Sequence, residues 1–151
     1  MINFNNLSIK MFEYFKKKKA PKEDDNNVVS LPANDDVVIG YKKKAQDELA
    51  YLLNFMESHE KDEELFRYAV KANFIEDDNA EHMWVQVTEF KDGFFIGRLA
   101  NEPATIKLIK YGDHVKVSRK NVEDWILEDF VTNTKVGHFS RNYIKSNSKH
   151  K

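Results

Sequence analysis

The feature that most constrains the fold is a change in the spacing of apolar residues near position 68. Between about residues 42 and 58, Leu49, Leu52 and Met56 recur three or four positions apart. This spacing places them on one face of a helix. From Tyr68 onward, apolar residues alternate with polar ones, as is typical of strands with one buried face. The sequence therefore predicts a helix followed by a run of strands.

The second half of the chain divides into strand-like segments separated by turn signals. Asp92-Gly93 stands between two such segments and predicts a hairpin, because a type I′ turn requires positive φ at both central residues. Strands that follow each other through tight turns usually pair as an antiparallel meander. We therefore predict an α+β fold, with an N-terminal helix or helix pair packed on a small antiparallel, SH3-like sheet or half-barrel of four to six strands. The strand-like segments are 70–74, 83–87, 94–100, 114–118 and 122–127.

Three shorter segments carry weaker patterns. Val37-Val38-Ile39 suggests a short strand or a cover for an apolar edge. Leu65, Phe66 and Ala69 follow an acidic stretch and are spaced for a second helical turn or two. Residues 139–144 are expected to form a short closing helix or strand.

The ends of the chain differ in composition from the middle. Residues 1–41 are expected to form a flexible or accessory segment, with a short helix that ends in four lysines at 16–19 and a polar linker around two prolines. Residues 42–145 are expected to form a single α+β domain. Residues 146–151 are expected to form a basic tail.

The formal net charge of -1 hides a strong asymmetry along the chain. Residues 45–81 contain 11 acidic and 3 basic residues, whereas residues 131–151 contain 5 basic residues and no acidic ones. Two interpretations are open for the acidic helical region: a docking surface for another protein, such as a basic one, or a solvated face. Lys greatly exceeds Arg, which disfavours a sequence-specific nucleic-acid reader because such recognition prefers Arg. The sequence leaves the oligomeric state open.

Several kinds of chemistry have no matching motif. The chain has no cysteine, which removes disulfides and thiolate zinc sites. It contains neither a phosphate-binding glycine loop nor a G-x-S-x-G nucleophile motif. His59-Glu60 starts like a zinc-binding H-E-x-x-H motif, but Glu63 occupies the position of the second His. We therefore predict no metal, no cofactor and no transmembrane segment, and we expect a cytoplasmic location.

One group of residues is a candidate site. A histidine beside a carboxylate can act as a general acid or base, and His82 is the candidate for this role. Adjacent strand residues face opposite sides, so Glu81 is a poor partner for His82, and Asp113 or Asp124 is the better candidate. In the alternative interpretation, His82 and Asp124 hold turns and strand ends, while Trp84 and Trp125 fill the core or its rim.

Several motifs occur together in a recognisable order. They are Glu81-His82-Met83-Trp84, Gly97-Arg98-Leu99 leading into Asn101-Glu102-Pro103, Gly112-Asp113-His114-Val115 and Asp124-Trp125. In this order and spacing, residues of about 65–130 resemble the YegJ-like family of bacterial domains of unknown function. The resemblance implies a compact bacterial domain and no established activity. Its polar motif positions could line a shared pocket or form a turn-forming skeleton, and the skeleton is the favoured interpretation.

The leading functional hypothesis is a non-enzymatic binding or protein-interaction module of a bacterial cytoplasmic protein. The alternative is a hydrolase-type enzyme that uses His82 with Asp113 or Asp124. A third hypothesis, contact with nucleic acid or a membrane surface through the lysine-rich ends, has less support. The candidate binding residues are Glu81, His82, Trp84, Asn101, Asp124 and Trp125.

Overall fold

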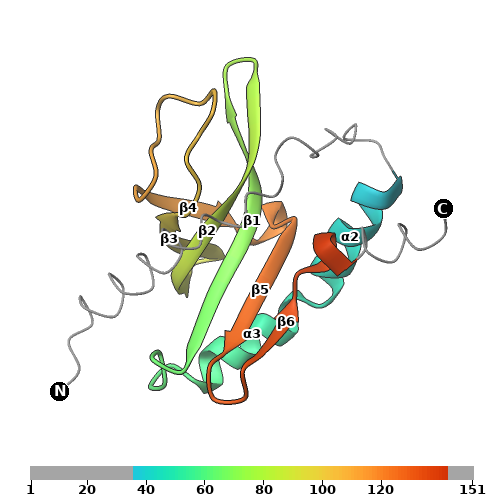
Figure 1. The fold of residues 1–151 in the computed structure, drawn as a ribbon, viewed down its shortest axis with the longest axis vertical. Coiled ribbons are helices and arrows are strands. Elements are labelled where there is room, and N and C mark those ends of the chain that lie inside the picture. The colour runs from blue at the N-terminus through green and yellow to red at the C-terminus, as the bar shows by residue number, and fades with distance from the viewer. Residues whose placement is uncertain (1–35, 143–151) are drawn as a thin grey trace.

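The computed structural model describes residues 36–142 of the chain, and side chains from Ile39 onward (Figure 1). The helix predicted before Lys16–Lys19 and the basic tail at 146–151 lie outside the described residues. The domain boundaries predicted at residues 41 and 145 stay predictions.

Two consecutive helices precede the sheet. They are α2 (Asp36–Asp47) and α3 (Leu49–Ser58). Tyr41, Ala45, Leu49 and Leu52 are buried at spacings of four, four and three, which confirms the apolar helical face predicted for about residues 42–58. The helical region begins earlier than expected and is divided into two helices at Glu48, a division that the sequence did not predict.

The prediction of a strand at residues 37–39 is wrong, because these residues belong to α2. Three β-branched residues favour a strand only weakly, and packing of the helix as a whole overrides that preference.

Six strands form one open antiparallel sheet, and the helix pair packs on it, which confirms the α+β fold (Figure 1). The SH3-like description stays a prediction. The strand order is β4-β3-β2-β1-β5-β6. The strands are β1 (Phe66–Glu76), β2 (Asn79–Lys91), β3 (Phe94–Leu99), β4 (His114–Ser118), β5 (Asp124–Asp129) and β6 (Thr134–Gly137).

The observed strands differ from the predicted ones in three respects. Strands β1 to β4 form the predicted meander, but β5 returns to pair with the other side of β1, so the meander does not continue. The helical turn predicted from Leu65 to Ala69 is absent, because β1 begins at Phe66, and Phe66 and Tyr68, two positions apart on one face of the strand, both join the main core. Strand β6 was not predicted, because it has only four residues and its sequence lacks a clear apolar alternation.

The turns follow the local sequence closely. Asp92 and Gly93 have φ values of 53° and 81°, which confirms the predicted hairpin between β2 and β3. Residues 139–142 are helical, in agreement with the expected closing element.

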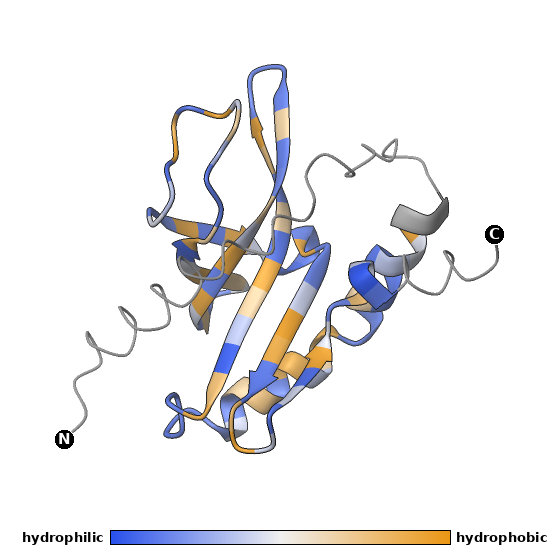
Figure 2. Cartoon of the chain, in the orientation of Figure 1, coloured by the Kyte–Doolittle hydropathy of each residue, from blue (hydrophilic) through white to orange (hydrophobic). Residues whose placement is uncertain are grey.

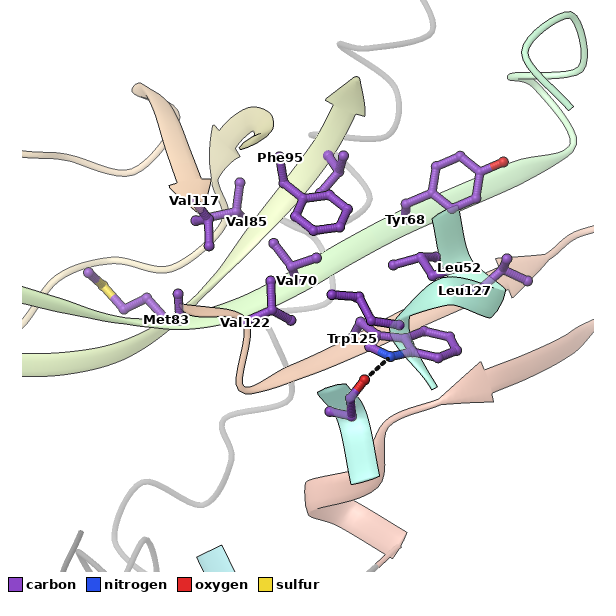
Figure 3. Packing of buried hydrophobic residues seen from close by; sticks show 14 of the residues in the cluster. Leu52, Tyr68, Val70, Met83, Val85, Phe95, Val117, Val122, Trp125 and Leu127 are labelled. Atoms are coloured by element: carbon purple, nitrogen blue, oxygen red, sulfur yellow. Dashed lines mark hydrogen bonds between the residues drawn. The ribbon is translucent and has the colours of Figure 1, made fainter. Parts of the chain in front are cut away.

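The core lies between the helix pair and one face of the sheet (Figure 3). Figure 2 shows apolar and polar residues alternating along the strands, while the connecting turns are mainly hydrophilic. Trp125 is fully buried, and its indole N–H donates to the Ala45 carbonyl over 3.0 Å, which ties β5 to α2. Truncating a Trp in such a position costs roughly 3–5 kcal/mol.

The two neighbours of β1 pair with it over different lengths. Strand β1 pairs with β2 as far as Glu76 but pairs with β5 only as far as Lys71. The outer half of the β1–β2 hairpin therefore projects beyond β5, as Figure 1 shows.

Candidate functional site

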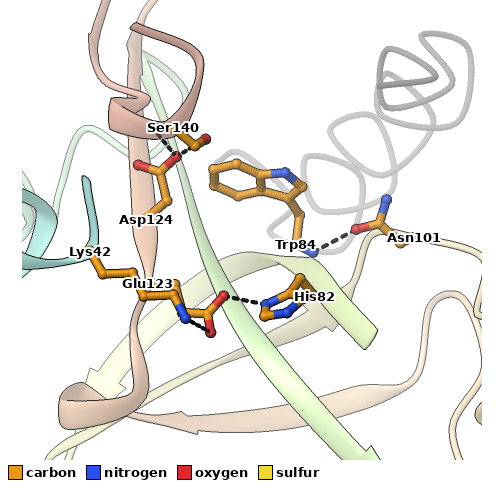
Figure 4. A network of polar contacts seen from close by, with 7 residues as sticks. All are labelled: Lys42, His82, Trp84, Asn101, Glu123, Asp124 and Ser140. Atoms are coloured by element: carbon orange, nitrogen blue, oxygen red, sulfur yellow. Dashed lines mark hydrogen bonds and ion pairs between the residues drawn. The ribbon is translucent and has the colours of Figure 1, made fainter. Parts of the chain in front are cut away.

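His82 is paired with a carboxylate that the sequence did not single out. His82 lies on β2, and Glu123 lies just before β5, on the far side of β1. The His82 Nδ1 atom is 2.6 Å from Glu123 Oε2, and the Lys42 Nζ atom is 2.9 Å from Glu123 Oε1 (Figure 4). The Glu123 side chain is 9% exposed and that of His82 is 47% exposed. The pair thus has a buried anion and a solvent-accessible imidazole.

The position and charge of Glu123 follow from its neighbours. Its N–H donates to the Lys71 carbonyl over 2.8 Å, which fixes the backbone against β1. Burial raises the pKa of Glu123, but the hydrogen bonds and positive charges of His82 and Lys42 outweigh burial and hold the pKa below its ordinary value. Glu123 therefore stays ionised and orients His82.

Asp124 is directed toward the C-terminal segment. Its carboxylate accepts hydrogen bonds from the N–H groups of Trp125, Phe139 and Ser140 and from the Ser140 hydroxyl. Asp124 is fully buried, and burial raises its pKa despite the lowering effect of these hydrogen bonds. This residue joins β5 to the closing helical turn.

Glu81 holds the long loop between β3 and β4. Its carboxylate accepts from the N–H groups of Ala104, Thr105 and Ile106 over 2.6 to 3.1 Å. Partial burial raises the pKa of Glu81, but these backbone hydrogen bonds outweigh it and lower the pKa overall. Glu81 therefore acts as an anchor for three consecutive amides.

Asn101 holds the start of the same loop. Its Oδ1 atom accepts from the Trp84 N–H over 2.5 Å, as Figure 4 shows. Trp84 itself is 9% exposed and packs in a small cluster with Ala69 and Ala100, whereas Trp125 belongs to the main core.

The structure brings His82 to Glu123 rather than to either carboxylate predicted for it. Asp113 is exposed and accepts from the Lys110 N–H over 2.9 Å. Asp124 is bonded to the residues around Ser140. Sequence reasoning missed Glu123 and Lys42, and no local signal pointed to them, since their contacts join segments far apart in the chain.

A groove of about 560 Å³ lies next to the His82–Glu123 pair. Helix α2 lines one side with Ile39 and Lys42, the outer half of β1 lines another with Ile75, and Lys120 and Glu123 complete it. Within residues 36–142, no group of His, Asp or Glu side chains is arranged to hold a metal ion.

A second surface lies at the opposite end of β1, and we call it the acidic end. It combines acidic residues of α3 and the following turn with three apolar residues of the α3–β1 and β5–β6 turns. Its members are Glu57, Glu60, Asp62, Glu63, Glu64, Leu65, Phe130 and Val131, all of them exposed.

Contacts and charge define the acidic end. The Phe130 N–H donates to the Leu65 carbonyl over 2.9 Å, so the two turns form one surface. Leu65, Phe130 and Val131 are 42%, 44% and 65% exposed. Burial, together with the negative charges of Glu63 and Asp62, raises the pKa of the adjacent Tyr68 to about 12. The five exposed carboxylates outnumber Lys61, which is exposed in the same turn, so the surface carries excess negative charge.

Comparison with known proteins places the chain in a family. The family model described as "Uncharacterized protein conserved in bacteria (DUF2314)" matches residues 35–150. The chain belongs to this family. It is also 28% identical over 88 residues to the Uncharacterized protein YegJ of Escherichia coli (strain K12), a match that covers 58% of this chain and 53% of that protein. The YegJ-like resemblance is thereby confirmed.

The match to YegJ covers only part of either protein, and the search of solved structures adds no relative. The chain spans about half the length of the curated relative that it matches. No solved structure matches the chain at a significant level. Neither the description of the family nor the name of this relative specifies an activity.

The helices of the described residues bear on the prediction of no transmembrane segment. None of those between residues 36 and 142 is both long enough and apolar enough to cross a membrane.

Proposed function

We propose that this chain is a non-enzymatic protein-interaction module that binds a basic partner at the acidic end. The observation that carries the proposal is the exposure of Leu65, Phe130 and Val131 on one surface beside five acidic side chains. Apolar side chains that are exposed together and rimmed by charge are typical of interaction sites.

The two kinds of side chain have different roles in this proposal. The apolar group supplies the area that leaves water when a partner docks, and Phe130 is the aromatic side chain best suited to be its centre. The acidic rim speeds association with basic surfaces and repels acidic ones. The partner is therefore expected to present an apolar side chain flanked by lysine or arginine.

The alternative is a hydrolase that uses His82 with Asp113 or Asp124. Both carboxylates accept hydrogen bonds from the backbone elsewhere, and His82 is held by Glu123. These contacts favour the interaction module over that version of the enzyme. A cytoplasmic location stays a prediction.

The test is affinity capture from a bacterial lysate with the full chain and two charge variants. Glu60→Lys/Glu63→Lys reverses two charges at the acidic end, and Glu89→Lys/Glu102→Lys makes the same change at exposed positions elsewhere. We expect a basic protein to be captured by the wild type and by the control variant, and lost from the acidic-end variant and at high salt.

Two further measurements make the outcome decisive. Phe130→Ser removes the apolar centre without changing charge and should also abolish capture, while Tm values show whether each variant is folded. Capture of the same proteins by all the variants, or capture that salt does not weaken, would refute binding at the acidic end.

A further inference from the structure

Among the described residues, the outer half of β1 has an unpaired edge that faces the groove. Beyond Lys71, the described strand that pairs with β1 is β2. Within residues 36–142, no hydrogen bond joins the backbone of Asn73 or Ile75 to another segment on the side of β5. Both residues line the groove, and Ile75 is 73% exposed.

The direction of the free backbone groups follows from the adjacent pairing. The Lys71 carbonyl accepts from the Glu123 N–H, so the polar groups of Lys71 point toward the side of β5. In an antiparallel strand this direction alternates from residue to residue. The N–H and C=O groups of Asn73 and Ile75 therefore point the same way as those of Lys71, into the groove beyond the start of β5.

The groove provides more than a bare edge. Ile39 on α2 is 50% exposed and, with Ile75, offers apolar contact to an added segment. Lys42, Lys43 and Lys120 line the groove, against the single carboxylate of Glu123. Glu123 already contacts Lys42, and Lys43 pairs with Asp47 one turn along α2 over 2.5 Å. Within the described residues, Lys120 has no ion pair. The groove therefore carries excess positive charge.

We propose that an extended, acidic segment of a partner protein adds to the sheet as a strand along β1 at Asn73–Ile75. Addition of a strand to a free sheet edge gives affinity through main-chain hydrogen bonds and selectivity through alternate side chains. Apolar residues of the segment would meet Ile39 and Ile75, and its acidic residues would meet the lysines.

The charge of the groove separates this occupant from a second copy of the chain. Two copies paired edge to edge along β1 would bring Lys42, Lys43 and Lys120 of both chains together. An acidic strand would instead compensate these charges. This surface lies at the other end of β1 from the acidic end, so the inference stands independently of the proposed function.

The experiment is an NMR titration of the full chain with a blocked peptide of alternating aspartate and valine. We expect the amide signals of Asn73 and Ile75 to shift, and their hydrogen exchange to slow at saturation. A peptide with lysine in place of aspartate should bind more weakly. The same acidic peptide, N-methylated on the backbone groups of one edge, should lose binding, because methylation removes its donors without altering the protein.

Protein variants test the same contact from the other side. Ile75→Pro removes one N–H that faces the groove and leaves the pairing with β2 intact, so affinity should fall roughly threefold to tenfold. Ile75→Val keeps that N–H and is the matched control. Lys120→Glu should weaken binding about threefold.

Three results would overturn the proposal. The first is the absence of shifts at Asn73 and Ile75 up to about 1 mM acidic peptide. The second is equal binding of the acidic, lysine-containing and N-methylated peptides. The third is protection of both amides before any peptide is added, which would mean that the chain itself or a second copy fills the edge, and dependence on protein concentration would distinguish these two.

Discussion

Replacement of Asp124 by Asn tests whether this motif residue is a structural link or part of a working site. The substitution keeps the shape of the side chain but removes its charge and one acceptor oxygen. In the wild type, Oδ1 accepts from the N–H groups of Trp125 and Phe139, and Oδ2 accepts from the N–H and hydroxyl of Ser140. Asn can keep only one of these two pairs.

The expected cost follows from these contacts. If the remaining oxygen stays with Trp125 and Phe139, the NH2 group of the new asparagine faces the Ser140 N–H. Both groups are hydrogen-bond donors, so no hydrogen bond forms between them. The hydroxyl of Ser140 can rotate to accept, but a buried N–H left without a partner costs about 1–3 kcal/mol. Loss of charge weakens the two retained hydrogen bonds by about 1 kcal/mol each, and relief of the buried charge offsets part of this. We expect Asp124→Asn to lower the free energy of unfolding by about 3 kcal/mol.

Denaturant and thermal unfolding provide the assay. A loss of about 3 kcal/mol corresponds to a fall in Tm of about 12 °C for a domain of this size. Asp113→Asn is the matched control, since Asp113 is exposed and caps a surface turn, and it should stay within about 0.5 kcal/mol of the wild type.

A small effect would refute the reasoning. If Asp124→Asn unfolds within about 0.5 kcal/mol of the wild type, the carboxylate does not hold the closing turn. The motif position would then need a functional explanation.

Two other substitutions probe the sheet and the buried ion pair. Gly97→Ala would place a Cβ atom 1.8 Å from the Gln86 carbonyl oxygen and force β2 and β3 apart, so we expect a loss of about 3 kcal/mol in unfolding experiments. Gly93→Ala meets no atom within 4 Å but keeps a φ of +81°, and should cost only about 1 kcal/mol; equal losses would contradict the steric argument. Glu123→Gln should be pH-dependent: the pKa of Glu123 lies below 4.5 in the folded protein, so its stabilisation is present above pH 4.5 and is lost as pH falls through the folded pKa. The difference in Tm between wild type and Glu123→Gln should therefore shrink as pH falls below 4.5, and a constant difference would exclude an ionic role.

The candidate site was only partly predictable from the sequence. His82 was recognisable because its type and neighbours suggest acid–base chemistry, but its partner was not. The sequence placed Asp113 and Asp124 near His82 on the assumption of a continuing meander. The structure instead places Glu123 there, because β5 pairs with β1 and brings residue 123 past Lys71.

Local patterns by themselves determined the helical region at about residues 42–58, the first five strands and the hairpin at Asp92-Gly93. These features depend on side-chain period and on φ preferences, which act over a few residues. Turn chemistry similarly explains Gly112, whose φ is 89°.

Only the tertiary structure decided which edge of the sheet β5 joins. The cost of closing a loop grows slowly with its length, so separation along the chain hardly distinguishes one edge from another. The outcome depends on burial, and Trp125 reaches both the core and the Ala45 carbonyl only when β5 lies beside β1. That single pairing creates the His82–Glu123 contact and, within the part of the chain that the structure describes, leaves the outer edge of β1 at Asn73–Ile75 without a strand partner.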